Sequence, residues 1–391
     1  SAWEYDRTTD EYYLHLFSKK QPDLNWENKN VRHDVYEMMR FWLDKGIDGF
    51  RMDTINMLSK VQSMPDGIKV DGIKYGIPYP YTSNGPKIHD FLQEMNREVL
   101  SKYDIMTVGE TPGVDPETAR LYVDSDRNEL NMIFQFELMG VDCELDKWKI
   151  KPWKLTTFKR IMYKWYEGLK DKGWNSLYLN NHDQPRMVSR FGNDGKFRVE
   201  SAKMLGTLLH TFSGTPYIYQ GEEIGMTNVK FDDISDYRDI EILNMYKERT
   251  LLGVPKDTLM RSIHYMGRDN ARTPMQWDSS ENAGFTSGKP WIKVNPNYTD
   301  INVEQALSDE NSIFYYYQKL ISLRKRYREI VYGDLKMLLE DHEQIFAYTR
   351  ELDGETLLIV LNFFERPAVF ELPLDYRLDD AELLLSNYPV K

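Results

Sequence analysis

The stretch Gly46-Ile47-Asp48-Gly49-Phe50-Arg51-Met52-Asp53-Thr54 decides how the rest of the chain is interpreted. Its apolar residues give it the body of a short buried strand. Because side chains alternate along a strand, Arg51 and Asp53 are expected to point the same way at its end. A guanidinium and a carboxylate in such a place are costly unless they are paired or used. The stretch therefore predicts either a structural ion pair or part of a functional site.

The composition argues against several classes of protein. The chain has 391 residues, of which 41% are hydrophobic and 13% aromatic, enough for a large core and for more than one domain. Its net charge of -12 argues against nucleic acid and anionic membrane surfaces as partners. No apolar run reaches the roughly 18 residues that a membrane helix needs. We therefore expect no nucleic-acid partner and no membrane.

Cysteine usage and the start of the sequence bear on the compartment. The single cysteine, Cys143, cannot form an internal disulfide, so an oxidising compartment is not required. We expect Cys143 to be a small buried apolar residue. The sequence starts at Ser1 with no signal-like segment. These features predict a cytoplasmic protein.

Helix and strand patterns alternate through most of the chain. Apolar residues at helical spacing predict helices over residues 31–43, 86–100, 155–169 and 202–212. The first should be capped by Asn30 and bury the stripe that includes Met38 and Trp42, and a further helix should open at Asp115-Pro116-Glu117. Predicted strands cover residues 46–54, 105–109, 131–136, 176–180 and 215–220. Five such alternations predict a parallel sheet with helices outside.

Each predicted strand is followed by a carboxylate on its C-terminal side. These residues are Asp53, Glu110, Glu137, Asp183 and Glu222. A (β/α)8 TIM barrel has this property, because its active site is built from the loops at that face. A doubly wound sheet would share it, but no Gly-rich phosphate loop follows any strand. Since such a barrel has eight strands and about five βα units are present, we expect three strands to be missing at the N-terminus.

The two ends of the chain depart from the barrel pattern. Residues 1–30 are aromatic, charged and irregular, and residues 226–300 form a long polar segment with several turns. After a helix over residues 312–328, two strand-like runs flank Asp353-Gly354, which is a strong hairpin signal. We predict the end of an inserted loop subdomain over 1–30, a partial barrel over 31–334 and a small antiparallel β domain over 335–391.

Three carboxylates, Asp53, Glu110 and Asp183, are expected at one face of the barrel. A metal site is one explanation, because hard cations prefer carboxylate oxygens, but no dense calcium-type loop is present. Glycoside hydrolysis is the other, since it needs a carboxylate nucleophile and a protonated carboxylic acid. Arg51 beside Asp53 would keep the nucleophile ionised, and neighbouring acids would raise the pKa of Glu110. We predict neither a metal nor a cofactor.

Several motifs resemble those of a known family. Gly-Phe-Arg-Met-Asp-Thr (49–54), Thr-Val-Gly-Glu-Thr (107–111) and Asn-Asn-His-Asp-Gln (180–184) resemble conserved regions of the α-amylase superfamily, glycoside hydrolase family 13. Gln-Pro-Asp-Leu-Asn (21–25) and the stretch 268–277 resemble its oligo-1,6-glucosidase and maltase branch. The resemblance runs through the whole chain and implies a TIM-barrel enzyme acting on short α-glucosides.

The resemblance also implies roles for individual residues. Asp53 is similar in position to the family's nucleophile and Glu110 to its general acid/base. Asp183 is similar to the third carboxylate, which binds sugar hydroxyls and stabilises the transition state. The residues expected to contact the glucose unit are Arg51, His182, Phe17 and Arg268.

The implied activity is that of a retaining α-glucosidase, which releases glucose from non-reducing ends. Relatives that prefer α-1,6 bonds tend to carry Val after the nucleophile, so Thr54 predicts a preference for maltose, with sucrose as a further substrate. An oligo-1,6-glucosidase (isomaltase) and a sucrose isomerase or other transglucosidase are alternatives. A non-catalytic interaction module or an inactive fragment is another, because the expected loss of three strands would leave little activity. We expect a monomer whose partner is a disaccharide or short oligosaccharide.

Overall fold

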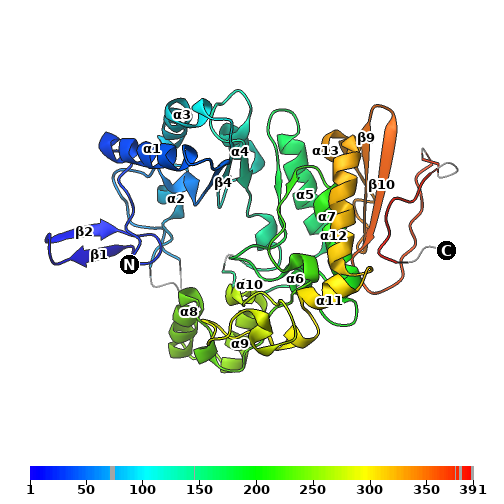
Figure 1. The fold of residues 1–391 in the computed structure, drawn as a ribbon. Coiled ribbons are helices and arrows are strands. Elements are labelled where there is room, and N and C mark those ends of the chain that lie inside the picture. The colour runs from blue at the N-terminus through cyan, green and yellow to red at the C-terminus, as the bar shows by residue number, and fades with distance from the viewer. Residues whose placement is uncertain (71–74, 145, 375, 378–380, 389–391) are drawn as a thin grey trace. The chain divides into compact units, whose positions relative to one another are not determined.

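The computed structural model describes residues 1–70, 75–144, 146–374, 376–377 and 381–388 (Figure 1). The chain divides into two compact units. Unit 1 holds Ser1–Phe136 and Glu167–Asn175, and unit 2 holds Glu137–Tyr166 and Ser176–Lys391. Within the described part of the chain, no helix is both long and apolar enough to cross a membrane.

A three-stranded parallel sheet forms the centre of unit 1. Its strands, in hydrogen-bonded order, are β3 (Gly49–Met52), β4 (Met106–Glu110) and β5 (Met132–Phe134). A Cβ atom at Gly49 would lie 1.8 Å from the carbonyl oxygen of Met106, so this pairing requires glycine. A parallel bridge joins Ile133 to Asn175, at the start of the next predicted strand. The predicted parallel order is confirmed for these three strands.

Helices cover this sheet, and their caps follow the chemistry of the sequence. The helices of unit 1 are α1 (Lys29–Leu43), η1 (Ile55–Met57), α2 (Tyr79–Thr82), α3 (Ile88–Glu98), η2 (Leu100–Lys102) and α4 (Pro116–Val123). The side chain of Asp115 accepts from the backbone N–H of Thr118 at 2.8 Å, as predicted for an N-cap before proline. The predicted cap of α1 was wrong, because Asn28 rather than Asn30 caps it.

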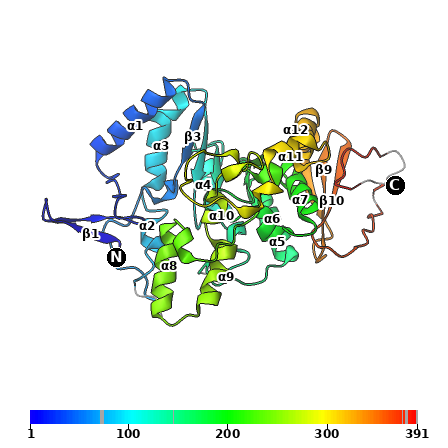
Figure 2. The ribbon, with the colours of Figure 1, turned by 60° about the horizontal axis from the view of Figure 1, so that its bottom comes forward.

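The buried face of α1 also differs from the predicted apolar stripe. Met38 and Trp42 are 48% and 46% exposed, whereas Arg32 is buried. Arg32 Nε donates to both carboxylate oxygens of Glu94 on α3 at 3.1 Å, so its charge is paired inside. This contact lies where α1 and α3 run side by side in Figure 2. A pattern of apolar residues alone could not predict a buried arginine.

Residues 1–30 contain a β-hairpin that the sequence pattern did not indicate. β1 (Trp3–Asp6) pairs antiparallel with β2 (Glu11–Leu14), with Tyr5 opposite Tyr12 (Figure 1). Each strand has only four residues, and although β1 alternates aromatic with acidic residues, β2 does not alternate, so the signal is short and weak. The prediction of an irregular segment was therefore wrong for this hairpin.

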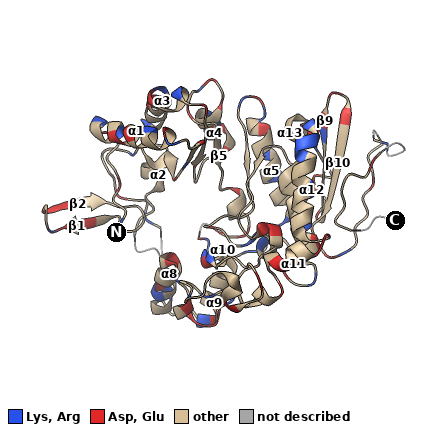
Figure 3. Ribbon diagram, in the orientation of Figure 1, with Lys and Arg blue, Asp and Glu red and all other residues tan. Residues whose placement is uncertain are grey.

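Unit 2 contains the remaining parallel strands. β6 (Ser176–Leu177) and β7 (Thr215–Pro216) pair in parallel, as predicted, but each has two residues instead of five or six. The helices that accompany them are α5 (Leu155–Leu169), whose last turn belongs to unit 1, α6 (Met187–Phe191), α7 (Arg198–Thr211), α11 (Val303–Ser308), α12 (Ile313–Arg326) and α13 (Arg328–Tyr332). Arg324, Lys325 and Arg326 form the last turn of α12, which is blue in Figure 3, and their positive charges interact favourably with the negative end of the helix dipole.

The segment 226–300, predicted as polar turns, contains three α-helices. These are α8 (Ile240–Leu251), α9 (Lys256–Met266) and α10 (Asp269–Arg272). Ile242 of α8 and Ile263 of α9 are fully buried in one apolar cluster, which also contains Cys143. The apolar positions of α8 are diluted by charged residues, so its buried face was missed. The expected burial of Cys143 is confirmed.

The C-terminal part of unit 2 is an antiparallel sheet. Its strands β8 (Asp334–Leu338), β9 (Ile345–Leu352) and β10 (Glu355–Asn362) lie in the order β10-β9-β8. Asp353 and Gly354 form the β9–β10 turn with φ values of 53° and 90°. Positive φ at both turn residues is typical of a two-residue hairpin. The hairpin prediction is confirmed.

A buried lysine ties α5 to this sheet. Lys159 is fully buried, and its Nζ donates to the carbonyls of Leu339 at 2.7 Å, His342 at 2.9 Å and Ile345 at 3.1 Å. Leu339 and His342 lie in the connection between β8 and β9, and Ile345 is the first residue of β9. An ammonium has three N–H donors, so all of them are satisfied without a carboxylate.

Candidate active site

In unit 1, Arg51, Asp53 and Glu110 meet at the carboxyl ends of β3 and β4. Arg51 Nη1 donates to Asp53 Oδ1, and Arg51 Nη2 lies 2.7 Å from Glu110 Oε2. One guanidinium therefore bridges carboxylates from two neighbouring parallel strands. The side chain of Asp53 is 70% exposed, whereas that of Glu110 is only 8% exposed. The two carboxylates thus share a cation but differ in their contact with solvent.

Burial shifts the pKa values of Glu110 and Arg51, two members of this bridge, in opposite directions. Burial raises the pKa of Glu110, the charge of Arg51 opposes this, and the charge of Asp53 raises it further. Burial also lowers the pKa of Arg51, but its bonds to Asp53 and Glu110 outweigh this and leave that pKa raised. The predicted raised pKa of Glu110 is confirmed, although burial contributes more than the neighbouring acid. The buried carboxyl is therefore suited to hold a proton.

Thr54, directly after Asp53, has a left-handed backbone with φ 39° and ψ 43°. This conformation is rare for a β-branched residue and costs about 1–3 kcal/mol. It directs the N–H of Thr54 to Glu110 Oε2 at 3.3 Å. Threonine carries no sequence signal for a left-handed conformation, so this link was not predicted. Its presence indicates that the turn after β3 helps to hold Glu110.

In unit 2, the structure brings together three further predicted residues, His182, Asp183 and Arg268. Arg268 Nη1 lies 3.5 Å from Asp183 Oδ1, and His182 Nε2 lies 3.7 Å from Asp183 Oδ2. Arg272 Nη2 donates to Asp183 Oδ1, and Arg272 Nε donates to the carbonyl of His182 at 2.9 Å. Two arginines therefore stabilise the negative charge of Asp183 in the loop after β6.

Two residues of this cluster were not among the predicted site residues, Arg272 and Asp239. Asp239 Oδ1 and Oδ2 accept from Arg268 at 2.6 and 2.8 Å. Burial raises the pKa of Asp239, but these bonds outweigh it and hold the pKa below its usual value. Arg272 could have been found, because it lies four residues after Arg268 and such residues share a helix face. No sequence signal marks Asp239.

The other predicted residues lie apart from these clusters. Phe17 is 52% exposed in the loop after β2, and its contact with sugar stays a prediction. Glu137 lies beyond β5, and its carboxylate binds Lys164 Nζ and Trp165 Nε1, each at 2.9 Å. Among the residues that the structure describes, no group of three or more His, Cys, Asp or Glu could hold a metal ion.

Glu222, another predicted strand-end acid, is buried. Its Oε1 accepts from the hydroxyl of Tyr317 at 2.8 Å, and burial raises its pKa to about 8. Glu222→Gln should therefore stabilise the protein at pH 8 by a few kcal/mol. The folded pKa lies above the ordinary 4.5, so Glu222 contributes full stability below pH 4.5 and loses it as the pH rises toward 8.

The measurement is the free energy of unfolding of both proteins between pH 4.5 and 8. The difference in the free energy of unfolding between the variant and the wild type should widen steadily as the pH rises. Glu223→Gln removes a carboxylate from the neighbouring position and is the matched control. A gap for Glu222→Gln that is independent of pH would contradict the prediction.

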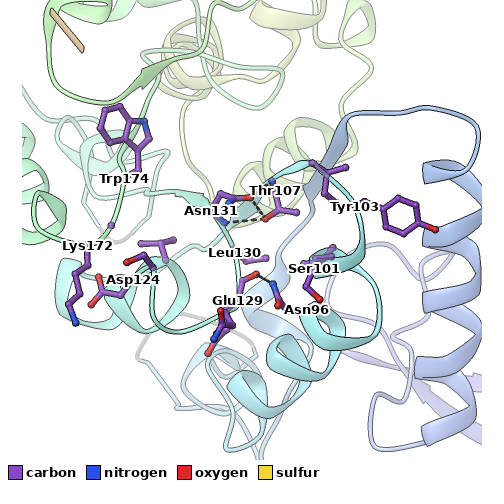
Figure 4. Close-up of a pocket in the computed structure, with 16 residues that line it drawn as sticks. Asn96, Ser101, Tyr103, Thr107, Asp124, Glu129, Leu130, Asn131, Lys172 and Trp174 are labelled. Carbon is purple, nitrogen blue, oxygen red and sulfur yellow. Dashed lines mark hydrogen bonds between the residues drawn. The ribbon is translucent and has the colours of Figure 1, made fainter. Parts of the chain in front are cut away.

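A separate cavity of about 410 Å³ lies within unit 1 (Figure 4). Much of its polar lining is already hydrogen-bonded within the protein. Asn131 Oδ1 accepts from the N–H and hydroxyl of Thr107 at 2.8 and 3.0 Å, and Asn96 Nδ2 donates to the carbonyl of Glu129 at 3.2 Å. None of the eight predicted site residues lines it. We therefore assign this cavity no part in the candidate site.

The chain matches two known protein families along its length. Residues 1–333 match the family described as alpha amylase, catalytic domain, and residues 335–391 match the maltogenic amylase C-terminal domain. The chain therefore has the α-amylase fold, a TIM-barrel catalytic domain followed by an antiparallel β domain.

Individual proteins match the chain from end to end. An oligo-1,6-glucosidase of Parageobacillus thermoglucosidasius is 64% identical over 392 residues, which cover 100% of this chain and 70% of the relative. An oligo-1,6-glucosidase of Bacillus cereus is 59% identical over 393 residues, 100% of this chain and 70% of that protein. The chain thus spans about 70% of the length of each of these two relatives.

Solved structures agree with this assignment. The trehalose-6-phosphate hydrolase of Bacillus licheniformis has a TM-score of 0.91 and 48% identity, covering 99% of this chain and 69% of that one. A mutant isomaltulose synthase of Erwinia rhapontici NX5, in complex with its natural substrate sucrose, has a TM-score of 0.89 and 46% identity, covering 93% and 65%. This chain belongs to the α-amylase family of glycoside hydrolases.

Proposed function

We propose that this protein is a retaining α-glucosidase that releases glucose from the non-reducing ends of short α-glucosides. The bridge formed by Arg51 is the observation that carries the proposal. It pairs an exposed carboxylate, Asp53, with a buried carboxyl of raised pKa, Glu110. A retaining glycosidase needs one ionised nucleophile and one proton donor beside each other.

The proposed reaction has two steps. Asp53 attacks the anomeric carbon while the glycosidic bond breaks, and Glu110 gives its proton to the leaving oxygen. Glu110 then takes a proton from water, the water oxygen attacks the same carbon, and the ester with Asp53 breaks. Two inversions return glucose with its original configuration and restore both carboxyls.

The remaining predicted residues bind the glucose unit in this proposal. Asp183, held by Arg268 and Arg272, accepts hydrogen bonds from sugar hydroxyls. The other sugar contacts in this proposal are Arg51 and Phe17 of unit 1 and His182 of unit 2. The protein does this as a cytoplasmic monomer, without a metal or a cofactor. Only a sugar substrate is needed as its partner.

The test of the proposed function is the configuration of the first product. Maltose and isomaltose are added separately, and the anomers of released glucose are followed by proton NMR before they equilibrate. We expect α-glucose to appear first from each accepted substrate. Early β-glucose, or no hydrolysis of either sugar, would refute the proposal.

Two observations favour different linkages. The name oligo-1,6-glucosidase, carried by two relatives, is an argument for isomaltose as the preferred substrate. Thr54 is an argument for maltose, because its hydroxyl can hydrogen-bond a hydroxyl of the acceptor sugar. We propose that the enzyme cleaves both and that Thr54 shifts the balance toward maltose. Thr54→Val should lower the ratio of kcat/KM for maltose over isomaltose by about 10-fold, the effect of one pocket contact.

The control for this prediction is Thr107→Val, the same substitution at the start of β4. Thr107 bonds Asn131 and should leave the ratio unchanged. The predicted maltose preference is wrong if the wild-type enzyme already prefers isomaltose. Thr54 is not the selector if its Val variant keeps the wild-type ratio.

Isomerisation of sucrose is a second candidate, favoured by the likeness to isomaltulose synthase. That reaction would use the same carboxylates, with fructose instead of water attacking the glucosyl intermediate. Chromatography of the products from sucrose separates the two activities. Equal amounts of glucose and fructose indicate hydrolysis, and isomaltulose indicates isomerisation.

A further inference from the structure

The turn η1 contacts the end of β4 through consecutive residues. The N–H of Thr54, at the start of this turn, bonds Glu110 Oε2 at 3.3 Å. The next residue, Ile55, packs on Gly109, where a Cβ atom would lie 2.7 Å from Ile55 Cγ2. A larger residue at position 109 would therefore push the turn away from the strand. The turn after Asp53 is packed directly against the strand that carries Glu110.

Asn56 makes the next contact, and it is a polar one in a buried place. Its side chain is fully buried, and its Nδ2 donates to the carbonyl of Pro112 at 3.0 Å and to Asn84 Oδ1 at 3.3 Å. The two acceptors set the orientation of the carboxamide, because the reversed group would place its oxygen against the Pro112 carbonyl. Asn56 therefore links the loops that follow β3 and β4.

Asn84 holds Asn56 from the other side. The N–H of Asn84 donates to the carbonyl of Asn56 at 2.7 Å, and its Oδ1 accepts from the hydroxyl of Tyr122 at 2.6 Å. Tyr122 lies on α4 and is fully buried, so this anchor is part of the core. Asn84 therefore fixes the position of the Asn56 carboxamide relative to the buried core around Tyr122.

The side-chain oxygen of Asn56 indicates that this residue does more than fill space in the core. Within the described residues, Asn56 Oδ1 is buried and has no hydrogen-bond partner. Leaving a buried acceptor unpaired costs about 1–3 kcal/mol, which an apolar side chain of similar size would avoid. The two hydrogen bonds that Nδ2 donates are what Asn56 provides and an apolar side chain could not.

We propose that Asn56 is a positioning residue that sets the separation of the Asp53 and Glu110 carboxyls. Asp53 lies three residues before Asn56, and Glu110 lies two residues before its acceptor Pro112. The proposal rests on the proposed roles of these carboxyls in glycoside hydrolysis. Retention needs them about 5–5.5 Å apart, and a misplacement of about 1 Å costs roughly 100-fold.

The test compares two substrates in Asn56→Ala. Maltose needs a well-placed proton donor, whereas α-glucosyl fluoride has a leaving group that departs with little protonation. We expect kcat for maltose to fall about 10–100-fold and kcat for the fluoride to stay close to wild type. Partial unfolding would lower both by the same factor, so the ratio reports on positioning.

Asn56→Asp is the second variant, because it keeps the shape and removes the donor. At neutral pH its carboxylate should repel the Pro112 carbonyl and lower maltose turnover. At acid pH the protonated carboxyl regains one O–H donor, so maltose turnover relative to wild type should recover. Thr107→Val, on the strand β4 that carries Glu110, is the control, and it should leave the substrate ratio unchanged even if Tm falls.

The possible results distinguish a failure of the positioning role from a failure of the proposed function. Equal loss on both substrates, or unchanged maltose turnover in both variants of Asn56, would overturn the positioning role. Wild-type protein that hydrolyses neither substrate would instead refute the proposed function. Selective loss on maltose, with recovery of the Asp variant at acid pH, would support the proposal.

Discussion

Replacing Asp53 by Asn is expected to reduce turnover of maltose and isomaltose by at least about 10⁴-fold. An amide nitrogen or oxygen cannot replace the carboxylate that forms the glucosyl ester in the proposed mechanism. The side chain of Asp53 is 70% exposed, so its replacement should cost little stability. Steady-state kinetics and a thermal melt of the same preparation measure both effects.

Covalent trapping identifies the nucleophile directly. A fluorinated glucosyl reagent slows the second step, so the ester accumulates and the labelled peptide can be sequenced by mass spectrometry. We expect the label on Asp53 and none in Asp53→Asn. Asp48→Asn makes the same change at an exposed position just before β3 and should keep full activity. A label on another carboxylate would reassign the nucleophile.

Glu110→Gln is expected to have the second-largest effect, and it should depend on the leaving group. Without a proton donor, maltose cleavage should slow by about 10²–10⁴-fold. The first step with α-glucosyl fluoride should remain fast, and the glucosyl enzyme should accumulate because no base activates water. A burst of fluoride in stopped-flow kinetics reports this intermediate. Glu117→Gln, at an exposed position on α4, is the matched control.

The pH profile offers a second measurement for Glu110. The protonated carboxyl is the active form, so kcat/KM for maltose should fall as the pH rises through the pKa of Glu110. Burial raises this pKa above its ordinary 4.5, so the fall should occur at a higher pH than an exposed glutamate would give. The fall should be absent in Glu110→Gln. Maltose hydrolysis at the wild-type rate by that variant would contradict the assignment.

Local sequence patterns correctly predicted those elements whose structure depends mainly on their own residues. Helix α5 begins and ends at the predicted residues, and Asp353-Gly354 forms the predicted hairpin turn. Elements that depend on distant contacts were missed or misjudged. Arg32 is buried because Glu94 and the backbone carbonyl of Trp26 pair its guanidinium, and the two-residue lengths of β6 and β7 were not indicated by their apolar runs.

The candidate site shows the same division. Asp53, Glu110 and Asp183 were proposed as site residues because strand ends in a barrel carry such residues. Asp239 was missed because its partner Arg268 lies 29 residues away, and the contact of Arg272 with Asp183 spans 89 residues. The left-handed turn at Thr54 was missed because threonine rarely adopts it.

The buried ammonium of Lys159 has a consequence for the order of events during protein synthesis. Its three carbonyl partners lie 180, 183 and 186 residues further along the chain. At about 5–20 residues per second, a ribosome adds the first of them roughly 10–40 s after Lys159. Until then the charged end of this lysine must stay in water, so α5 cannot complete its packing on the nascent chain. The later synthesis of residues 339–345 therefore allows α5 to complete its packing in unit 2.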